Sequence, residues 1–245
     1  MQAIILAAGR GSRLKDLTKN KPKPFAFVKV NNCSIIERIL QHLDELGVHD
    51  VVIVVGCLKE YFYENLGNKY GNVNITYVTS DDWENTNNSY SLYLARDYIK
   101  DNFLIIEGDE YFSKPFITKK DLSNKNNYWI GINQPVTGCL LFTDKKMNIL
   151  DLDIVRNKEQ LSKLSNYYKS CGVVKIKKNY IETFFDGLEQ FLKLEENKKK
   201  YFDLYIKDNL NKLPLKLLPI DAYIVWGEVD DQDDLINLER ELKKT

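Results

Sequence analysis

Short apolar runs alternate with amphipathic segments through the first half of the chain, and this alternation constrains the fold more than any other feature. The apolar runs predict buried strands, and the segments between them carry apolar residues on one helical face. Strands that alternate with helices form a parallel sheet covered on both faces. The predicted strands are residues 2–6, 51–55, 74–78 and 103–106, and the predicted helices are residues 34–46, 59–66 and 89–99.

The second half of the chain has a different pattern. After residue 109, short strand-like pieces separated by turn residues predict an antiparallel lobe. Strands are predicted at 128–133, 138–143, 149–154, 173–177, 215–218 and 223–226, and helices at 180–194, 198–210 and 231–242. The Lys- and Asn-rich stretches 119–127 and 195–200 are expected to be solvated loops or helix faces. We expect residues 1–245 to form a single α/β domain with a three-layer, mostly parallel Rossmann-like sheet and a small antiparallel lobe.

Charge and composition exclude several partners. The chain has 35 Lys and Arg against 35 Asp and Glu, so it lacks the basic excess that a nucleic-acid binder needs. Its longest apolar runs fall far short of the ~20 residues of a membrane helix, and its first residues lack the basic leader of a signal peptide. The cysteines are widely spaced, which favours reduced thiols in a cytoplasmic protein. They are Cys33, Cys57, Cys139 and Cys171.

Residues 6–14 read Leu-Ala-Ala-Gly-Arg-Gly-Ser-Arg-Leu and directly follow the first predicted strand. Small residues at a strand end let backbone N–H groups approach a ligand, and such a turn binds oligophosphate. Arg13 supplies a forked donor for phosphate oxygens, and Lys23 adds a cation between two prolines that stiffen its segment. The predicted nucleotide-binding residues of this part are Leu6, Ala7, Ala8, Gly9, Arg10, Gly11, Ser12, Arg13 and Lys23.

Other interpretations of this turn fit less well. A dinucleotide-binding fingerprint needs a third glycine where Leu14 stands, and no acid ends the next strand. The string of a P-loop is absent. A tight structural turn with two surface cations is the remaining alternative.

The turn resembles the signature of the nucleoside-triphosphate nucleotidyltransferase family, roughly L-A-A-G-x-G-[ST]-R-L followed by a Pro-Lys pair. The remainder is similar to the bacterial phosphocholine cytidylyltransferase branch, most densely up to Tyr111 and again at Glu228-Val229-Asp230. The resemblance implies a GT-A-like nucleotidyltransferase fold and Mg²⁺ as cofactor, with Arg13 and Lys23 as catalytic residues. It divides the domain into a nucleotide-binding part (1–112), an acceptor-binding lobe (113–222), and a returning metal-ligand strand and helix (223–245).

Two acidic clusters are candidates for the metal. Asp109 follows the strand at 103–106, at the edge of a parallel sheet where ligands bind, and the resemblance assigns a metal carboxylate there. Asp230 matches the family's second metal carboxylate, although a purely structural role stays open. The acids after it, Asp231, Asp233 and Asp234, are expected to cap the last helix. Glu107 and Glu110 are expected to face solvent or to lie behind the metal ligands.

The resemblance also suggests residues for the base and the acceptor. Residues 87–92 lie at a helix start, where their side chains either cap the helix or surround the nucleoside together with the loop near Gly56. Small residues in the turn favour a pyrimidine over a purine. The base side is assigned to Asn88, Ser89, Ser91 and Gly108, and the acceptor side to Trp129, Tyr168, Tyr205 and Glu228. For each of these aromatic residues a place in the core is the alternative. His42 and His49 are given no catalytic role.

The reaction that we expect is transfer of CMP from CTP to a small phosphorylated amine or amino acid, with release of pyrophosphate. Two positions where phosphocholine enzymes carry cage aromatics depart here, near Gly138-Cys139 and at Ile206. Phosphoethanolamine, 2-aminoethylphosphonate and L-glutamine phosphate therefore join phosphocholine as possible acceptors, with surface polysaccharide (capsule) or lipid decoration as the purpose. The alternatives are a sugar-1-phosphate uridylyl- or thymidylyltransferase and a non-catalytic nucleotide-binding module. We expect a monomer or homodimer without nucleic-acid or membrane partners.

Overall fold

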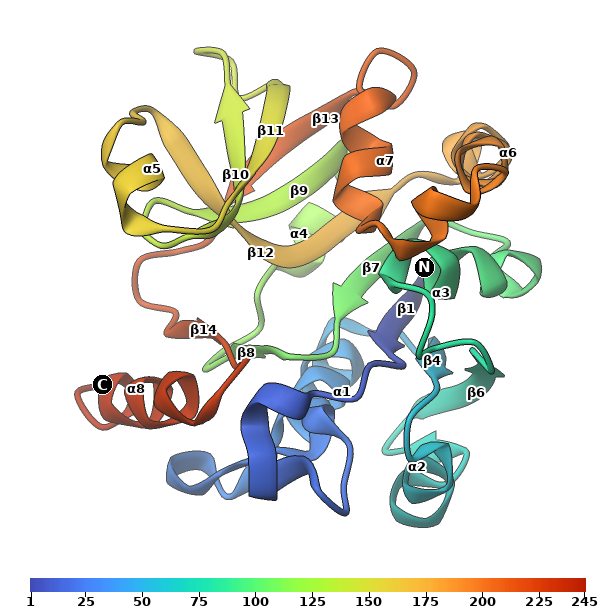
Figure 1. The fold of residues 1–245 in the computed structure, drawn as a ribbon, viewed down its shortest axis with the longest axis vertical. Coiled ribbons are helices and arrows are strands. Elements are labelled where there is room, and N and C mark those ends of the chain that lie inside the picture. The colour runs from blue at the N-terminus through green and yellow to red at the C-terminus, as the bar shows by residue number, and fades with distance from the viewer.

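The computed structural model describes the whole chain apart from the side chains of residues 15–17. One large sheet runs through the molecule in the strand order β11-β10-β12-β7-β1-β4-β6-β5, and β9 and β13 extend it beside β12 (Figure 1). The central strands β7, β1, β4 and β6 pair in parallel, as the sequence predicts. Their bounds are β1 (Gln2–Ala7), β4 (Asp50–Val55), β6 (Val73–Thr79) and β7 (Phe103–Glu107), with the short β5 (Lys69–Tyr70) at the edge.

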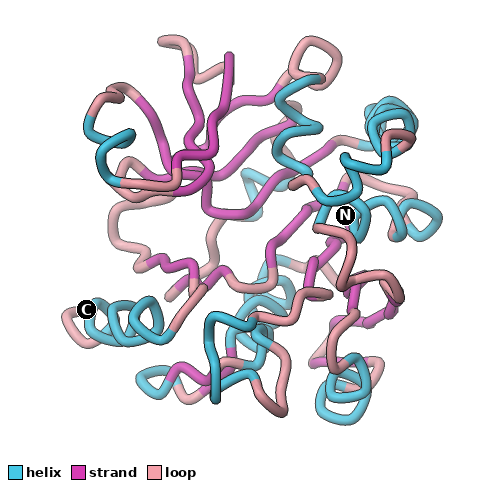
Figure 2. The backbone as a smooth tube through the Cα atoms, in the orientation of Figure 1, coloured by secondary structure: helices cyan, strands magenta, loops and turns pink.

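The antiparallel lobe joins this sheet through one long strand, β12 (Tyr167–Ile176). β12 pairs antiparallel with β7, in the register Val174↔Ile105, and with β9 and β10 in the lobe. The two parts therefore form one continuous sheet, which Figure 2 shows as a band of strands between helices. The other strands of the lobe are β9 (Asn127–Ile132), β10 (Gly138–Thr143), β11 (Ile149–Val155) and β13 (Leu215–Pro219).

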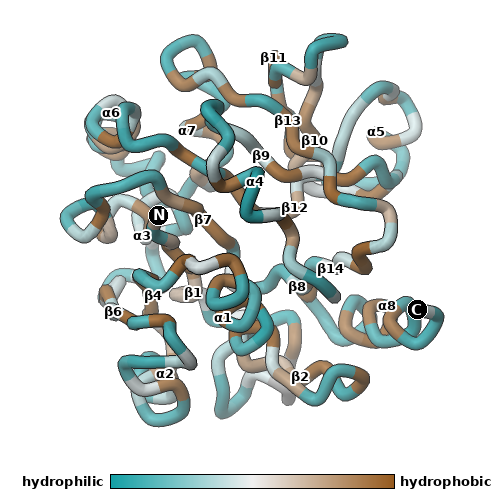
Figure 3. Tube along the Cα trace, turned by 180° about the vertical axis from the view of Figure 1, so that it is seen from behind, coloured by the Kyte–Doolittle hydropathy of each residue, from teal (hydrophilic) through white to brown (hydrophobic). Residues whose placement is uncertain are grey.

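Helices cover both faces of the sheet. Successive side chains of β1 point to opposite faces, and both sets are apolar, so each face needs a covering layer. Ala3 and Ile5 pack in the apolar cluster under α1, whereas Ile4 and Leu6 pack in the opposite cluster under α3 and α6. Figure 3 shows hydrophobic residues along the strands between these layers. The three-layer α/β prediction is confirmed. One layer holds α1 (Ile35–Leu46), α2 (Lys59–Leu66) and α8 (Gln232–Leu242), and the other holds α3 (Asn88–Leu94), α6 (Ile181–Leu192) and α7 (Phe202–Asp208).

The end of the chain returns to the sheet through a small antiparallel pair, β8 (Glu110–Phe112) with β14 (Trp226–Glu228). Ser113 fixes this pairing because its backbone N–H donates to the Val225 carbonyl and its hydroxyl accepts from the Val225 N–H. A strand was predicted at 223–226, so the observed strand begins where the prediction ends. As a result the acids after β14 lie beside those after β7.

The remaining elements refine the predictions. The helix predicted at 89–99 ends at Leu94 and continues as a 3-10 turn, and the stretch 119–127 begins with a helix that Thr118 caps. The capping box of Ser34 and Glu37 is confirmed. The other short elements are α4 (Lys119–Leu122), α5 (Lys158–Ser162), β2 (Phe27–Val28), β3 (Cys33–Ser34), η1 (Ser12–Thr18), η2 (Lys23–Phe25), η3 (Lys29–Asn31), η4 (Arg96–Tyr98), η5 (Lys178–Tyr180) and η6 (Glu195–Lys199). Among the helices that the structure describes, none is long and apolar enough to cross a membrane.

Candidate active site

A cavity of about 970 Å³ opens at the carboxyl ends of β1 and β7, between the parallel sheet, the antiparallel lobe and α8. It is the place where an open α/β sheet binds its ligand. Of the predicted residues, those that line it are Leu6, Ala7, Ala8, Gly9, Arg10, Gly11, Ser12, Arg13, Lys23, Asn88, Ser91, Gly108, Asp109, Glu228 and Asp230. The residues predicted from the sequence therefore form the side of this cavity that belongs to the parallel sheet.

Two glycines of this wall are required by their surroundings. Gly11 has a left-handed backbone with φ of 62°, and a Cβ at this position would lie 2.6 Å from the Cβ of Lys23. Gly108 follows β7, and a Cβ there would lie 2.8 Å from the carbonyl oxygen of Leu6. Larger residues would push the turn away from Lys23 or separate the ends of β1 and β7. The glycines thus allow the close approach that the prediction of a phosphate-binding turn needs.

Lys23 lies between two carboxylates that come from distant parts of the chain. Its Nζ is 2.6 Å from Oδ2 of Asp109 and 2.5 Å from Oδ1 of Asp230, and Nη2 of Arg13 is 2.7 Å from the same Asp230 oxygen. Burial alone would lower the pKa of Lys23, but the two carboxylates raise it above its ordinary value. Burial would raise the pKa of Asp230, but Lys23 and Arg13 hold it below its ordinary value. Lys23 and Asp230 are therefore both charged near neutral pH.

The predicted convergence of Asp109 and Asp230 is observed, and Glu228 joins them. One ligand oxygen from each of these three residues lies within 4.8 Å of the other two. Two local contacts hold them together: the Val229 N–H donates to the Asp109 carbonyl at 3.0 Å, and the Asp230 N–H donates to the Asp234 carboxylate at 2.9 Å. Three carboxylates with convergent oxygens are a donor set that suits a hard divalent cation. The group could therefore hold a metal ion.

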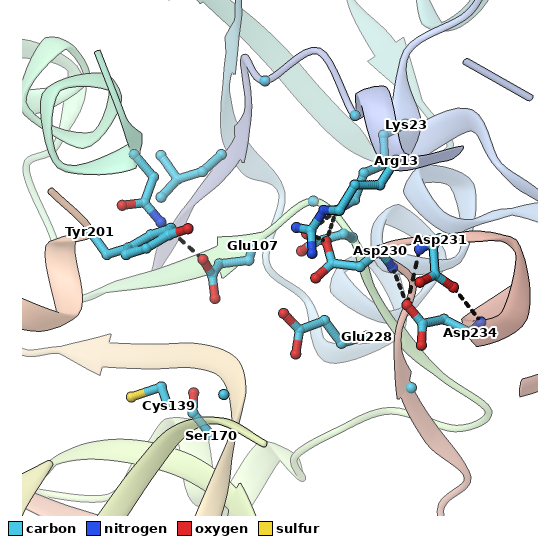
Figure 4. A pocket seen from close by; sticks show the side chains of 18 of the residues that line it. Arg13, Lys23, Glu107, Cys139, Ser170, Tyr201, Glu228, Asp230, Asp231 and Asp234 are labelled. Atoms are coloured by element: carbon cyan, nitrogen blue, oxygen red, sulfur yellow. Dashed lines mark hydrogen bonds and ion pairs between the residues drawn. The ribbon is translucent and has the colours of Figure 1, made fainter. Parts of the chain in front are cut away.

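The predicted cap of the last helix is also observed, and it contributes to this geometry. The Asp231 side chain accepts from the Asp234 N–H, and the Asp234 side chain accepts from the Asp231 N–H. The same Asp234 carboxylate holds the backbone of Asp230. Figure 4 shows this network beside Arg13 and Lys23. The capping acids thus position the candidate metal ligand.

A buried ion pair lies behind the carboxylate group. Lys169 Nζ, 4% exposed, is 2.9 Å from Glu228 Oε2 and donates to the Ser170 carbonyl at 2.9 Å. It also lies over the Trp226 ring, whose Nε1 donates to Glu110 Oε2 at 2.6 Å. Burial first, and then the Glu228 charge, raise the pKa of Glu110. Of the two expectations for Glu110, solvent exposure is wrong, because the side chain is buried; its place behind the candidate metal ligands stays a prediction.

Two further carboxylates line the cavity, and sequence reasoning did not assign either to the site. Glu107 accepts a hydrogen bond from Asn88 Nδ2 at 2.9 Å and lies near Tyr201 in Figure 4, so it is not solvent-facing. Asp203, at the start of α7, is 5% exposed and is hydrogen-bonded by the Cys139 thiol. Burial raises the pKa of both carboxyls. The sequence contains one signal that could have identified Asp203: an acidic residue interrupts the apolar pattern of a predicted helix.

Four predicted residues lie elsewhere. The hydroxyl of Ser89 is buried and donates to the carbonyls of Asn197 and Lys200, so it ties α3 to the segment before α7. Trp129 and Tyr205 are fully buried in the core, where Trp129 Nε1 donates to Ser170 Oγ and the Tyr205 hydroxyl donates to the Phe184 carbonyl. Tyr168 lines a separate, smaller recess. These aromatic residues follow the apolar pattern of their elements, which is the physical reason that they pack inward.

Comparisons with known proteins agree with this geometry. Residues 2–130 match the protein-family model described as Nucleotidyl transferase. The chain is 29% identical over 243 residues to the choline-phosphate cytidylyltransferase of Streptococcus pneumoniae, with 99% of each chain covered. It is 28% identical to the CMP-5'-(3-aminopropyl)phosphonate synthase of Streptomyces rubellomurinus, over 96% of this chain and 37% of that protein.

Solved structures give the same result. The CTP:phosphocholine cytidylyltransferase from Streptococcus pneumoniae superimposes with a TM-score of 0.82 at 28% identity, over 98% of both chains. The inositol-1-phosphate CTP transferase from T. maritima shares the fold, with a TM-score of 0.74 at 20% identity over 99% of this chain and 96% of that one. Because the family model spans more than half of the sequence and the cavity carries the signature residues, this chain belongs to the nucleotidyl transferase family.

Proposed function

We propose that this chain transfers CMP from CTP to a small phosphorylated or phosphonylated amine and releases pyrophosphate. The observation that carries the proposal is the convergence of the glycine turn, Lys23 and three carboxylates on one cavity. Backbone N–H groups and fixed cations suit an oligophosphate, and the carboxylate group suits Mg²⁺. The full-length similarity to a choline-phosphate cytidylyltransferase supports CTP as the donor.

The reaction needs positioning and charge neutralisation from the protein. An anionic oxygen of the acceptor phosphate attacks the α-phosphorus of CTP, a P–O bond forms, and the bond to the β-phosphate oxygen breaks as pyrophosphate leaves. Because that oxygen is already ionised near neutral pH, no protein nucleophile or base is required. Arg13 and Lys23 bind the phosphates, and the turn at 9–12 adds backbone donors. Mg²⁺, held by Asp109 and Asp230 beside Glu228, would supply further charge neutralisation on the phosphate oxygens.

Close packing of the segments around Ala8, Gly56 and Trp83 supports a pyrimidine. A Cβ at Gly56 would lie 2.6 Å from the Ala8 carbonyl oxygen and 2.8 Å from the Cβ of Trp83, so these three segments are in close contact. Trp83 and Ala8 line the cavity together with Asn88 and Ser91. The amide and hydroxyl groups are suitable hydrogen-bond partners for the edge of a cytosine ring.

Two buried carboxyls in the cavity support a cationic acceptor, because burial raises the pKa of both and a bound cation would favour their charged forms. They are Glu107 and Asp203, and no basic side chain among those that the structure describes forms an ion pair with either. The one buried lysine nearby, Lys169, is paired with Glu228 and covers the face of Trp226, so that ring is a poor wall for a quaternary ammonium. A primary ammonium donates hydrogen bonds that buried carboxylates need. We therefore favour a primary amine over choline.

The same proposal divides the domain by role. Residues 1–112 bind the nucleotide, residues 113–222 form the acceptor lobe, and residues 223–245 return the second metal carboxylate. The four cysteines are free in the described structure, which supports a reducing, cytoplasmic setting. The CDP-linked product would serve decoration of a surface polysaccharide or lipid.

Pyrophosphate release tests the proposal directly. CTP, UTP and dTTP are each combined with Mg²⁺ and with phosphoethanolamine, 2-aminoethylphosphonate, phosphocholine, L-glutamine phosphate or glucose 1-phosphate. We expect turnover with CTP and a primary-amine acceptor. Turnover restricted to UTP or dTTP with the sugar phosphate would refute it, and so would CTP binding without pyrophosphate release.

A matched pair of variants tests the acceptor end. Asp203→Asn removes the buried charge, and Asp208→Asn makes the same change at an exposed position of the same helix. We expect the first to raise KM for the amine acceptor at least tenfold without changing KM for CTP, and the second to change neither. Equal acceptor KM values in both variants would contradict the role of Asp203.

A further inference from the structure

Lys23 occupies the position that a metal ion would take. Its Nζ contacts oxygens of Asp109 and Asp230, and both residues belong to the carboxylate group with convergent oxygens. The side chain is only 13% exposed, and Arg13 adds a second cation to the Asp230 oxygen that Lys23 contacts. In this structure Lys23 and Arg13 therefore neutralise two of the three candidate metal ligands, and Lys169 pairs with the third, Glu228.

An ammonium and a divalent cation compete for these oxygens. Two cations a few ångströms apart in a partly buried site repel each other strongly, and each would need the same carboxylate lone pairs. A divalent ion that enters the free protein must displace Lys23 from its two charge-assisted contacts with Asp109 and Asp230. This displacement reduces the affinity of the empty site for metal.

A triphosphate changes this balance because it brings a new partner for the lysine. The Cβ of Lys23 is packed against Gly11, so the lysine is anchored beside the turn that is proposed to bind phosphate. Its flexible stem lets the ammonium move from the carboxylates to a phosphate oxygen without moving the backbone. The carboxylates are then free for a metal ion, which also contacts the phosphates.

We propose that Lys23 is the resident counter-ion of the metal site: it holds Asp109 and Asp230 closed to divalent cations in the free protein and leaves them when a nucleoside triphosphate binds. The metal site then forms only with nucleotide present, and nucleotide and metal each raise the affinity for the other. The release step rests on the proposed function, whereas the competition between Lys23 and metal in the free protein does not.

Manganese binding without nucleotide tests the competition. Mn²⁺ is titrated into the full-length protein, and free Mn²⁺ is measured by its electron paramagnetic resonance signal. Lys23→Met removes the counter-ion, and Lys21→Met removes the same charge two residues away on the same Pro-flanked segment. We expect Lys23→Met to bind Mn²⁺ at least tenfold more tightly than the wild type, and Lys21→Met to match the wild type. Equal affinity of all three proteins would overturn the proposal.

The wild type alone gives a second test that does not depend on the variant's folding. The Nζ resonance of Lys23 is followed by ¹⁵N NMR. We expect millimolar Mg²⁺ to leave it unchanged and CTP with EDTA to shift it. A shift with Mg²⁺ alone as large as that with CTP would overturn the proposal. If CTP fails to stabilise the protein against thermal unfolding, the proposed function fails, and the Mn²⁺ comparison still decides whether Lys23 closes the site.

Discussion

His42 should make the stability of the fold depend on pH, although it has no part in the chemistry. The side chain is 1% exposed within α1, and neither ring nitrogen has a hydrogen-bond partner among the described residues. Burial first, and then the positive charge of Arg38, lower the pKa of His42 from its ordinary value of 6.5 to about 3. The folded protein therefore keeps this imidazole neutral at a pH where the unfolded chain protonates it.

The sign and size of the effect follow from this difference. Because the unfolded state binds a proton that the folded state does not, the free energy of unfolding falls as the pH drops below 6.5, until the folded-state value of about 3 is reached. Between pH 7 and pH 5 this single group costs ~2 kcal/mol, at 1.36 kcal/mol per pH unit once the unfolded histidine is protonated. Replacing the unpaired imidazole by an apolar group of similar size also removes a buried polar cost of ~1–3 kcal/mol at neutral pH.

Urea unfolding at pH 7, 6 and 5, followed by tryptophan fluorescence, measures both effects. His42→Leu should be more stable than the wild type at pH 7, and its advantage should grow by ~2 kcal/mol at pH 5. The chain has two histidines, so the half-exposed His49 provides the control, and His49→Gln should keep the wild-type loss. If His42→Leu loses as much stability as the wild type between pH 7 and pH 5, the assignment of a neutral buried imidazole is refuted.

Two other predictions concern the site and the core. Lys23→Ala and Asp109→Ala should each lower kcat/KM by ~10²–10³ because the charge that develops in the transition state loses a fixed partner. The far-ultraviolet circular dichroism spectrum of each variant should be unchanged. Unchanged turnover in either variant would show that the residue has no part in the reaction. Trp129→Phe should lower the free energy of unfolding by ~1–3 kcal/mol because Ser170 Oγ loses one of its two donors and keeps only the Gly172 N–H, with acceptor KM within about twofold of the wild type. A tenfold rise in that KM at unchanged stability would return Trp129 to the acceptor site.

The parallel half of the fold could be predicted because its signals are local. A buried strand, a capping box such as Ser34 with Glu37, and a glycine turn each lie within a few residues of sequence. The same is true of the phosphate-binding turn, whose small residues and Arg13 line the cavity. Asp230 needed the family resemblance, because nothing near it in the sequence indicates that it meets Asp109.

The acceptor side was harder to predict because it is assembled by tertiary contacts. Asp203 and Glu107 belong to different elements, and only the packing of α7 against α3 and β11 brings them to one cavity. Trp129 and Tyr205 were assigned to this side by residue type, but their positions in apolar patterns take them into the core. Aromatic type alone does not tell a ligand wall from a packed interior.

The pairing of β14 with β8 means that the proposed metal site depends on two segments that lie far apart in the sequence. Asp230 reaches Asp109 only after residues 226–228 have added to the strand 110–112, more than a hundred positions earlier in the sequence. A chain cut before residue 226 would keep the whole glycine turn and yet carry only one of the two aspartates of the proposed metal site. Under the proposed function, nucleotide turnover is thereby withheld from any copy in which β14 has not paired with β8.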